Sequence, residues 1–91
     1  ELLIKNVHDP AVFCKDKISD FDFSPEGDLI AMGDYKGDVR VYNQSSGYCL
    51  TTFDDANSKI TGCKFIKNNV LITSSLDGVL RAYDLTKNLL F

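Results

Sequence analysis

Several residue types that catalytic and membrane-spanning proteins rely on are scarce in this 91-residue sequence, which has one histidine and no tryptophan. No uninterrupted apolar run exceeds four residues, whereas a membrane-spanning helix needs about 18–20. The single histidine, His8, is the one possible base of a Ser-His-Asp or Cys-His arrangement, and no Gly-x-Ser-x-Gly motif accompanies it. The six glycines are spread singly rather than grouped in a phosphate-binding loop. We therefore expect no catalytic residue, no cofactor, no small-molecule substrate and no membrane contact.

The sequence also lacks the usual signs of a metal site or a disulfide framework. Cys14, Cys49 and Cys63 are odd in number and form no Cys-x-x-Cys pair, so we expect reduced, core-type thiols of a cytosolic or nuclear protein. Asp54 and Asp55 lie in a segment without the distal glutamate of a calcium-binding loop, and we expect that segment to be a solvated loop. No metal site is predicted.

The charge is slightly acidic, because 10 Lys and Arg residues against 13 Asp and Glu residues give a net charge of −3. No run of basic residues occurs, so we expect at most local contacts with nucleic acid. The chain starts at Glu1 without a basic and then apolar leader. We expect no signal peptide and a chain that is a segment of a larger protein.

Two copies of one pattern follow each other along the sequence. The segment 18–23 aligns with 60–65 at an offset of 42 residues, and 37–43 aligns with 78–84 at an offset of 41. The one-residue difference falls in the turn that begins at Ser24, and turns tolerate changes in length. A repeat of about 40 residues is typical of the blades of a β-propeller.

Within each copy, apolar and polar side chains alternate, and a period of two is typical of β-strands. In the segment 20–23, Asp20 and Asp22 alternate with two phenylalanines, so we expect both carboxylates to face outward. Turn signals that contain glycine separate the runs at 25–27, 36–37 and 77–78. The predicted strands are 18–23, 28–33, 38–43, 48–53, 60–65, 69–74, 79–84 and 87–91.

These strands predict an all-β fold of antiparallel, four-stranded blades, about two of them in this chain. Residues 1–17 are predicted to hold the last strand of a preceding blade and a loop, and the two blades are predicted at 18–57 and 58–91. The unbroken apolar runs at 29–32 and 70–72 indicate strands that are buried on both faces. Two blades alone would leave two apolar sheet faces open to solvent.

The aligned segments resemble the WD-repeat family. The segment 77–84 has that family's Asp-Gly turn, third strand and terminal aromatic-Asp pair, and 37–43 occupies the same place in the first copy. Tyrosine stands where the family has tryptophan in both copies, and Lys36 stands where the family usually has aspartate. The resemblance implies a partial WD-repeat β-propeller that acts as a scaffold for protein-protein assembly.

More narrowly, the stretches 46–53, 60–65 and 73–85 are similar to consecutive blades of a WD-repeat subunit of the small-subunit processome. That similarity implies a role in ribosome biogenesis and pre-rRNA processing, in the nucleus and nucleolus. It also implies that the partners are other protein subunits of a large complex, and that the association with pre-ribosomal RNA is indirect.

Five residues are candidates for partner binding. Arg40 and Arg81 stand at equivalent positions of the two copies, where two guanidinium groups can hold a phosphate or a carboxylate. Alternatively, each arginine covers its own sheet and pairs with a nearby aspartate. Tyr35, Lys36 and Leu76 are predicted in exposed turns, which are typical places for contact with a protein partner.

Two other functions stay open at this point. The first keeps the fold and makes the protein an adaptor in trafficking or ubiquitin transfer, which reads an acidic or phosphorylated peptide through Arg40 and Arg81. The second belongs to another class, a small β-domain hydrolase that uses Asp54, Asp55 and His8.

Overall fold

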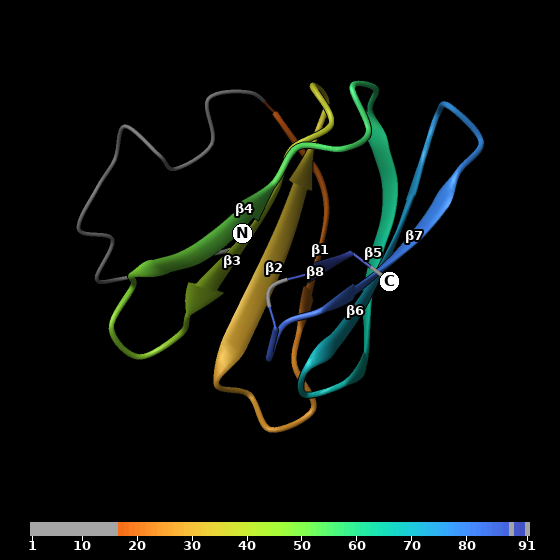
Figure 1. Cartoon of the computed structure of the whole chain (residues 1–91). Helices are drawn as coiled ribbons and strands as arrows, with labels where there is room; N and C mark the ends of the chain where they lie inside the picture. The colour runs from red at the N-terminus through yellow and green to blue at the C-terminus, as the bar shows by residue number, and fades with distance from the viewer. Residues whose placement is uncertain (1–16, 88, 91) are drawn as a thin grey trace.

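The computed structural model describes residues 17–87 and 89–90 of the chain. They form two four-stranded antiparallel sheets, each with its strands in sequence order (Figure 1). The first sheet contains β1 (Ile18–Phe23), β2 (Leu29–Asp34), β3 (Val39–Asn43) and β4 (Cys49–Phe53). The second sheet contains β5 (Ile60–Lys67), β6 (Val70–Ser75), β7 (Leu80–Asp84) and β8 (Leu89–Leu90). Among the described residues, no helix could cross a membrane.

The strands confirm the all-β fold of four-stranded blades, and their ends lie within two residues of the predicted ends. The register accounts for the sequence pattern, because Ile30 pairs with Tyr42 and Ala31 pairs with Val41, so that alternate residues of neighbouring strands share a face. The strand predicted within 1–17 falls outside the described residues, and of the loop that follows it only Lys17 is described.

The two sheets pack face to face around one apolar core. Phe53 of β4 stacks on Tyr83 of β7, with ring centroids 3.9 Å apart and ring planes inclined by 21°. Burial raises the pKa of the Cys63 thiol to about 12, so the thiol stays protonated, as expected for a core-type cysteine. The buried members of this core are Ala31, Val39, Val41, Phe53, Ala56, Ile60, Cys63, Leu71 and Tyr83.

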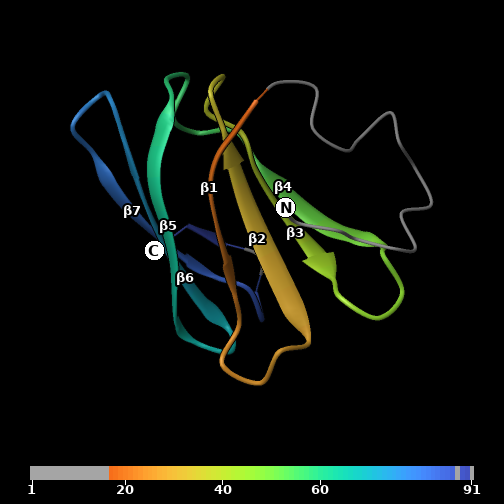
Figure 2. The same cartoon turned by 180° about the vertical axis from the view of Figure 1, so that it is seen from behind.

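Strands β1 and β5 lie side by side where the two sheets meet, as the view from behind also shows (Figure 2). Oδ2 of Asp20 accepts a hydrogen bond from the backbone N–H of Cys63 at 2.8 Å, and Oδ2 of Asp22 accepts one from Phe65 at 2.8 Å. The prediction that both carboxylates face outward is therefore wrong. Strand β5 is the edge of its sheet, and the carboxylates satisfy N–H groups that no strand pairs.

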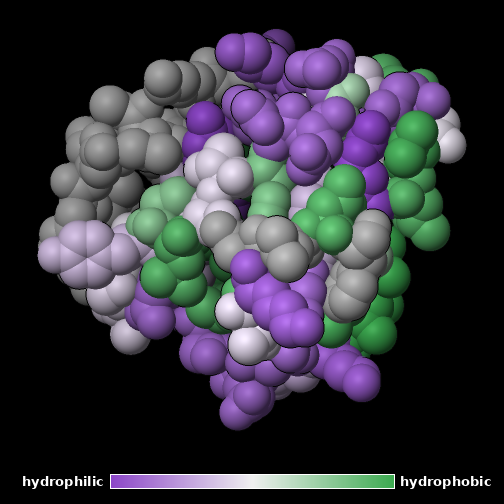
Figure 3. Space-filling view, viewed as in Figure 1, coloured by the Kyte–Doolittle hydropathy of each residue, from purple (hydrophilic) through white to green (hydrophobic). Residues whose placement is uncertain are grey.

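The far faces of the two sheets differ in exposure. On the first sheet, Ile30, Met32 and Tyr42 are at most 3% exposed and pack together against Cys49. Phe21 and Phe23 of β1 pair with Met32 and Ile30, so they lie on the same face, and they are 39% and 40% exposed. This face is therefore open only along β1. On the second sheet, Leu80 is 70% exposed. Hydrophobic side chains gather along the β6–β7 side of the molecule (Figure 3). The second sheet therefore has the open apolar side that the sequence predicts.

Candidate partner-binding surface

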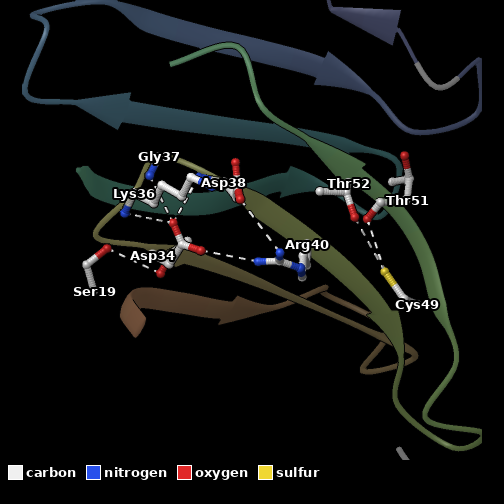
Figure 4. Close-up of polar contacts among 10 residues, drawn as sticks. Ser19, Asp34, Lys36, Gly37, Asp38, Arg40, Cys49, Thr51 and Thr52 are labelled. Atoms are coloured by element: carbon white, nitrogen blue, oxygen red, sulfur yellow. Dashed lines mark hydrogen bonds and ion pairs between the residues drawn. The ribbon is translucent and has the colours of Figure 1, made fainter. Parts of the chain in front are cut away.

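Arg40 lies on β3 and is 7% exposed. Its Nη1 is 3.2 Å from Oδ2 of Asp34, and its Nη2 is 3.6 Å from Oδ2 of Asp38. The other carboxylate oxygen of Asp34 accepts hydrogen bonds from the backbone N–H groups of Lys36, Gly37 and Asp38 at 2.9–3.0 Å (Figure 4). One carboxylate thus holds the turn 35–38 in place and neutralises a buried guanidinium.

Arg81 occupies the equivalent position on β7. Its Nη2 is 2.9 Å from Oδ2 of Asp77, and its Nη1 donates a hydrogen bond to Oγ of Ser75 at 3.0 Å. The Ser75 hydroxyl donates in turn to Oδ1 of Asp77, which also accepts the backbone N–H of Val79 at 3.1 Å. In this hairpin the carboxylate comes from the turn 76–79 rather than from the end of the preceding strand.

The two hairpins therefore build the same arginine-carboxylate pair from different sequence positions. At the repeat offset of 41 residues, Asp34 aligns with Ser75 and Lys36 aligns with Asp77. The first copy has moved its carboxylate two residues towards the N-terminus, into the position that serine holds in the second copy. The departure from the family pattern at Lys36 is thus compensated within the same turn.

The ion pairs decide how the two candidate arginines are placed. Both guanidinium groups form ion pairs with aspartates of their own hairpins. This is the alternative in which each arginine covers its own sheet and pairs with a nearby aspartate. A phosphate or carboxylate ligand would have to displace Asp34 or Asp77. Ligand binding by Arg40 and Arg81 stays a prediction, and the contacts on the described residues favour a structural role for both.

A pH titration tests the second hairpin. Hydrogen bonds from Arg81, and then from Ser75, lower the pKa of Asp77 from 3.8 to about 2. Because the folded pKa lies below the unfolded one, the carboxylate stabilises the fold fully above about pH 4, and this contribution is lost as the pH falls through about 2. We expect carboxyl carbon NMR to give Asp77 a midpoint near 2, and the variant Arg81→Ala to move it towards 3.8. Lys67 lies at the end of β5 that is remote from the turn 76–79, so the control variant Lys67→Ala should leave the titration midpoint of Asp77 unchanged.

The turn between β2 and β3, which carries Tyr35 and Lys36, and the turn between β6 and β7, which carries Leu76, lie at the same end of the molecule, the upper end in Figure 1. Lys59, which directly precedes β5, lies between them. Its ammonium is 4.3 Å from the centroid of the Tyr35 ring, and its backbone carbonyl accepts the N–H of Leu76 at 3.0 Å. Tyr35 is 47% exposed, Leu76 68% and Val79 43%. We call Tyr35, Lys36, Lys59, Leu76 and Val79 the turn-end surface.

The acidic pair in the segment between β4 and β5 is exposed, as predicted, but one of its members makes a structural contact. Oδ2 of Asp55 accepts a hydrogen bond from the Tyr83 hydroxyl at 2.8 Å. Burial, and then this hydrogen bond, raise the pKa of Tyr83 well above its ordinary value, so that the phenol remains a donor. His8 lies outside the described residues. Within residues 17–87 and 89–90, no group of three or more His, Cys, Asp or Glu side chains could hold a metal ion.

Repeats of about 40 residues that each fold into a four-stranded antiparallel sheet, packed face to face, define the class of β-propeller repeat proteins. The family model "WD domain, G-beta repeat" (WD40) matches residues 7–43 and 47–84. This chain therefore belongs to the WD40 repeat family, and the resemblance noted in the sequence is confirmed. The two matches end at Asn43 and Asp84, where β3 and β7 end.

Three curated relatives are proteins of one name. The chain is 36% identical over 72 residues to "Periodic tryptophan protein 2 homolog" of Caenorhabditis elegans, covering 78% of this chain and 8% of the relative. It is 37% identical over 68 residues to the Dictyostelium discoideum homolog, covering 71% and 7%. It is 38% identical over 63 residues to "Periodic tryptophan protein 2" of Arabidopsis thaliana, covering 68% and 7%. The chain thus spans 7–8% of the length of these relatives.

Among solved structures, the chain is similar to the crystal structure of the computationally designed Ika4 protein. The TM-score is 0.68, and the match covers 75% of this chain and 41% of that one. The sequence identity is 24%, so this similarity supports the fold alone.

Proposed function

We propose that this chain is part of a non-catalytic scaffold that assembles other protein subunits in ribosome biogenesis, within the small-subunit processome and pre-rRNA processing. The observation that carries the proposal is the 36–38% identity to relatives named periodic tryptophan protein 2, over 68–78% of the chain. The proposal places the protein in the nucleus and nucleolus. Its association with pre-ribosomal RNA is indirect and passes through protein partners.

The physical basis of such a scaffold is the rigidity of its turns. Asp34 holds the turn 35–38 through three backbone hydrogen bonds, and Ser58 Oγ accepts the backbone N–H of Asp77 at 3.1 Å, which ties the turn 76–79 to the segment before β5. Side chains on turns that are already ordered lose little conformational entropy when a partner binds. Tyr35, Lys36 and Leu76 are the residues that the proposal assigns to partner contact.

Affinity isolation from cells tests this function. We expect the tagged protein to localise to the nucleolus and to purify with particles that contain pre-rRNA. Mild ribonuclease treatment of the purified material should leave its immediate protein neighbours attached, because the association with RNA is indirect. A cytoplasmic protein that purifies without pre-rRNA would refute the proposal, and loss of every protein neighbour on ribonuclease treatment would refute the protein-mediated association.

A further inference from the structure

We propose that the turn-end surface binds a short acidic peptide segment of a protein partner, in which carboxylates flank an apolar side chain. The inference rests on the proposed role as a protein-assembly scaffold and names the chemistry of one partner. It assigns the reading of acidic groups to Lys36 and Lys59 instead of the two arginines.

The charged groups at this end of the molecule differ in whether they are paired. Arg40 and Arg81 are engaged by aspartates of their own hairpins. Within the described part of the chain, the ammonium groups of Lys36 and Lys59 form no ion pair, and Lys36 is exposed beside Tyr35. The turn that carries Tyr35 and Lys36 and the segment that carries Lys59 thus present two ammonium groups and one half-exposed phenol, all of which can donate hydrogen bonds to carboxylates.

The position of these groups is set by the backbone rather than by flexible side chains alone. The backbone N–H of Tyr35 donates to the carbonyl of Lys17 at 2.9 Å, and that of Lys36 donates to Asp34 at 3.0 Å. The segment that carries Lys59 is in close contact with the same turn, because a Cβ built on Gly37 would lie 2.6 Å from the carbonyl oxygen of Ser58. The two lysines are therefore carried by segments whose backbones are in close contact.

An apolar area continues directly from the cations. The backbone of Leu76 is bonded to that of Lys59, and Leu76 and Val79 are 68% and 43% exposed. In protein-binding sites, apolar side chains are typical of the centre and charged groups of the rim. The partner should therefore bring an apolar side chain together with its acidic groups.

A protein segment fits this surface better than a single strand of RNA. RNA-binding surfaces use open aromatic faces for base stacking, whereas the Lys59 ammonium lies 4.3 Å over the Tyr35 ring and covers one face of it.

Fluorescence anisotropy with the 91-residue chain tests the inference. The probe is a fluorescein-labelled peptide with two glutamates on each side of a leucine, and the reference probes are the same peptide with glutamines and an oligouridylate of equal charge. We expect the glutamate peptide to bind, and its dissociation constant to rise about tenfold in the double variant Lys36→Glu/Lys59→Glu. Leu76→Ser should weaken binding by a smaller factor. The matched control Lys67→Glu, with the same charge change at the other end of β5, should leave binding unchanged.

Circular dichroism of each variant shows whether the fold is retained. Equal binding of the glutamate and glutamine peptides, or equal weakening by Lys67→Glu and the double variant, would overturn the inference. Tighter binding of oligouridylate through the same lysines would also overturn it, in favour of a nucleic acid site. The localisation and pre-rRNA experiment is independent of this one, so that peptide binding without pre-rRNA would refute the proposed function, and pre-rRNA association without peptide binding would refute the inference.

Discussion

Replacement of Asp34 by alanine is expected to lower the free energy of unfolding by about 3–5 kcal/mol, the usual effect of removing one partner of a buried ion pair. Asp34 is 4% exposed and Arg40 7%. Without this carboxylate, the guanidinium of Arg40 keeps only Asp38, at 3.6 Å. The backbone N–H groups of Lys36 and Asp38 lose their acceptor, and that of Gly37 keeps only the carbonyl of residue 34, at 3.3 Å. Urea denaturation followed by circular dichroism measures the loss.

The second hairpin supplies a matched rescue for this experiment. The double variant Asp34→Ser/Lys36→Asp gives the first hairpin the serine and aspartate that the second hairpin has at Ser75 and Asp77. We expect it to recover most of the stability that the single variant Asp34→Ser loses, because the carboxylate returns to the turn in the position used by the second sheet. Equal stability of the single and double variants would show that the two positions are not interchangeable. Wild-type stability of Asp34→Ala would refute the importance of the buried pair itself.

Replacement of Gly37 by alanine is expected to lower the free energy of unfolding by about 3 kcal/mol or more, through two separate effects. Gly37 has a φ of +108°, in the region that L side chains rarely adopt. An added Cβ would also lie 2.6 Å from the carbonyl oxygen and 2.7 Å from the nitrogen of Ser58. Because both neighbours are backbone atoms, the segment before β5 would have to move. Urea denaturation measures this loss as well.

Gly78 is the control that separates conformation from contact. It occupies the equivalent turn with a φ of +80°, and no atom lies within 4 Å of a Cβ built there. Gly78→Ala should therefore cost only the conformational part, about 1–2 kcal/mol. If the two alanine variants lose equal stability, the close packing of the first turn on Ser58 contributes nothing. Displacement of the segment that carries Ser58 would also move Lys59. The variant Gly37→Ala should therefore also weaken the binding of the glutamate peptide.

The strands and the family could be predicted because their signals are local. Alternation with a period of two, glycine turns and two aligned copies are all visible within short stretches of sequence. The error at Asp20 and Asp22 concerns what their side chains face, whereas the pattern of strands is correct. Alternation shows that Asp20 and Asp22 share a face, but the edge of β5, whose N–H groups donate to them, belongs to the next repeat. By contrast, the unbroken apolar run at 29–32 predicts a strand that is buried on both faces, and this is confirmed for Ile30, Ala31 and Met32, which are at most 3% exposed.

By itself, the sequence determined the order and approximate bounds of the strands, the two repeats and the WD40 family, since each depends on residues that are neighbours in the chain or repeat at a fixed offset. Only the tertiary structure decided which charged groups are engaged and which are available. The carboxylates of Asp20 and Asp22 meet β5, and Lys59 meets Tyr35, because the two sheets pack against each other with their turns at one end. Contacts between distant segments depend on the packing of whole sheets, and no local pattern records that packing.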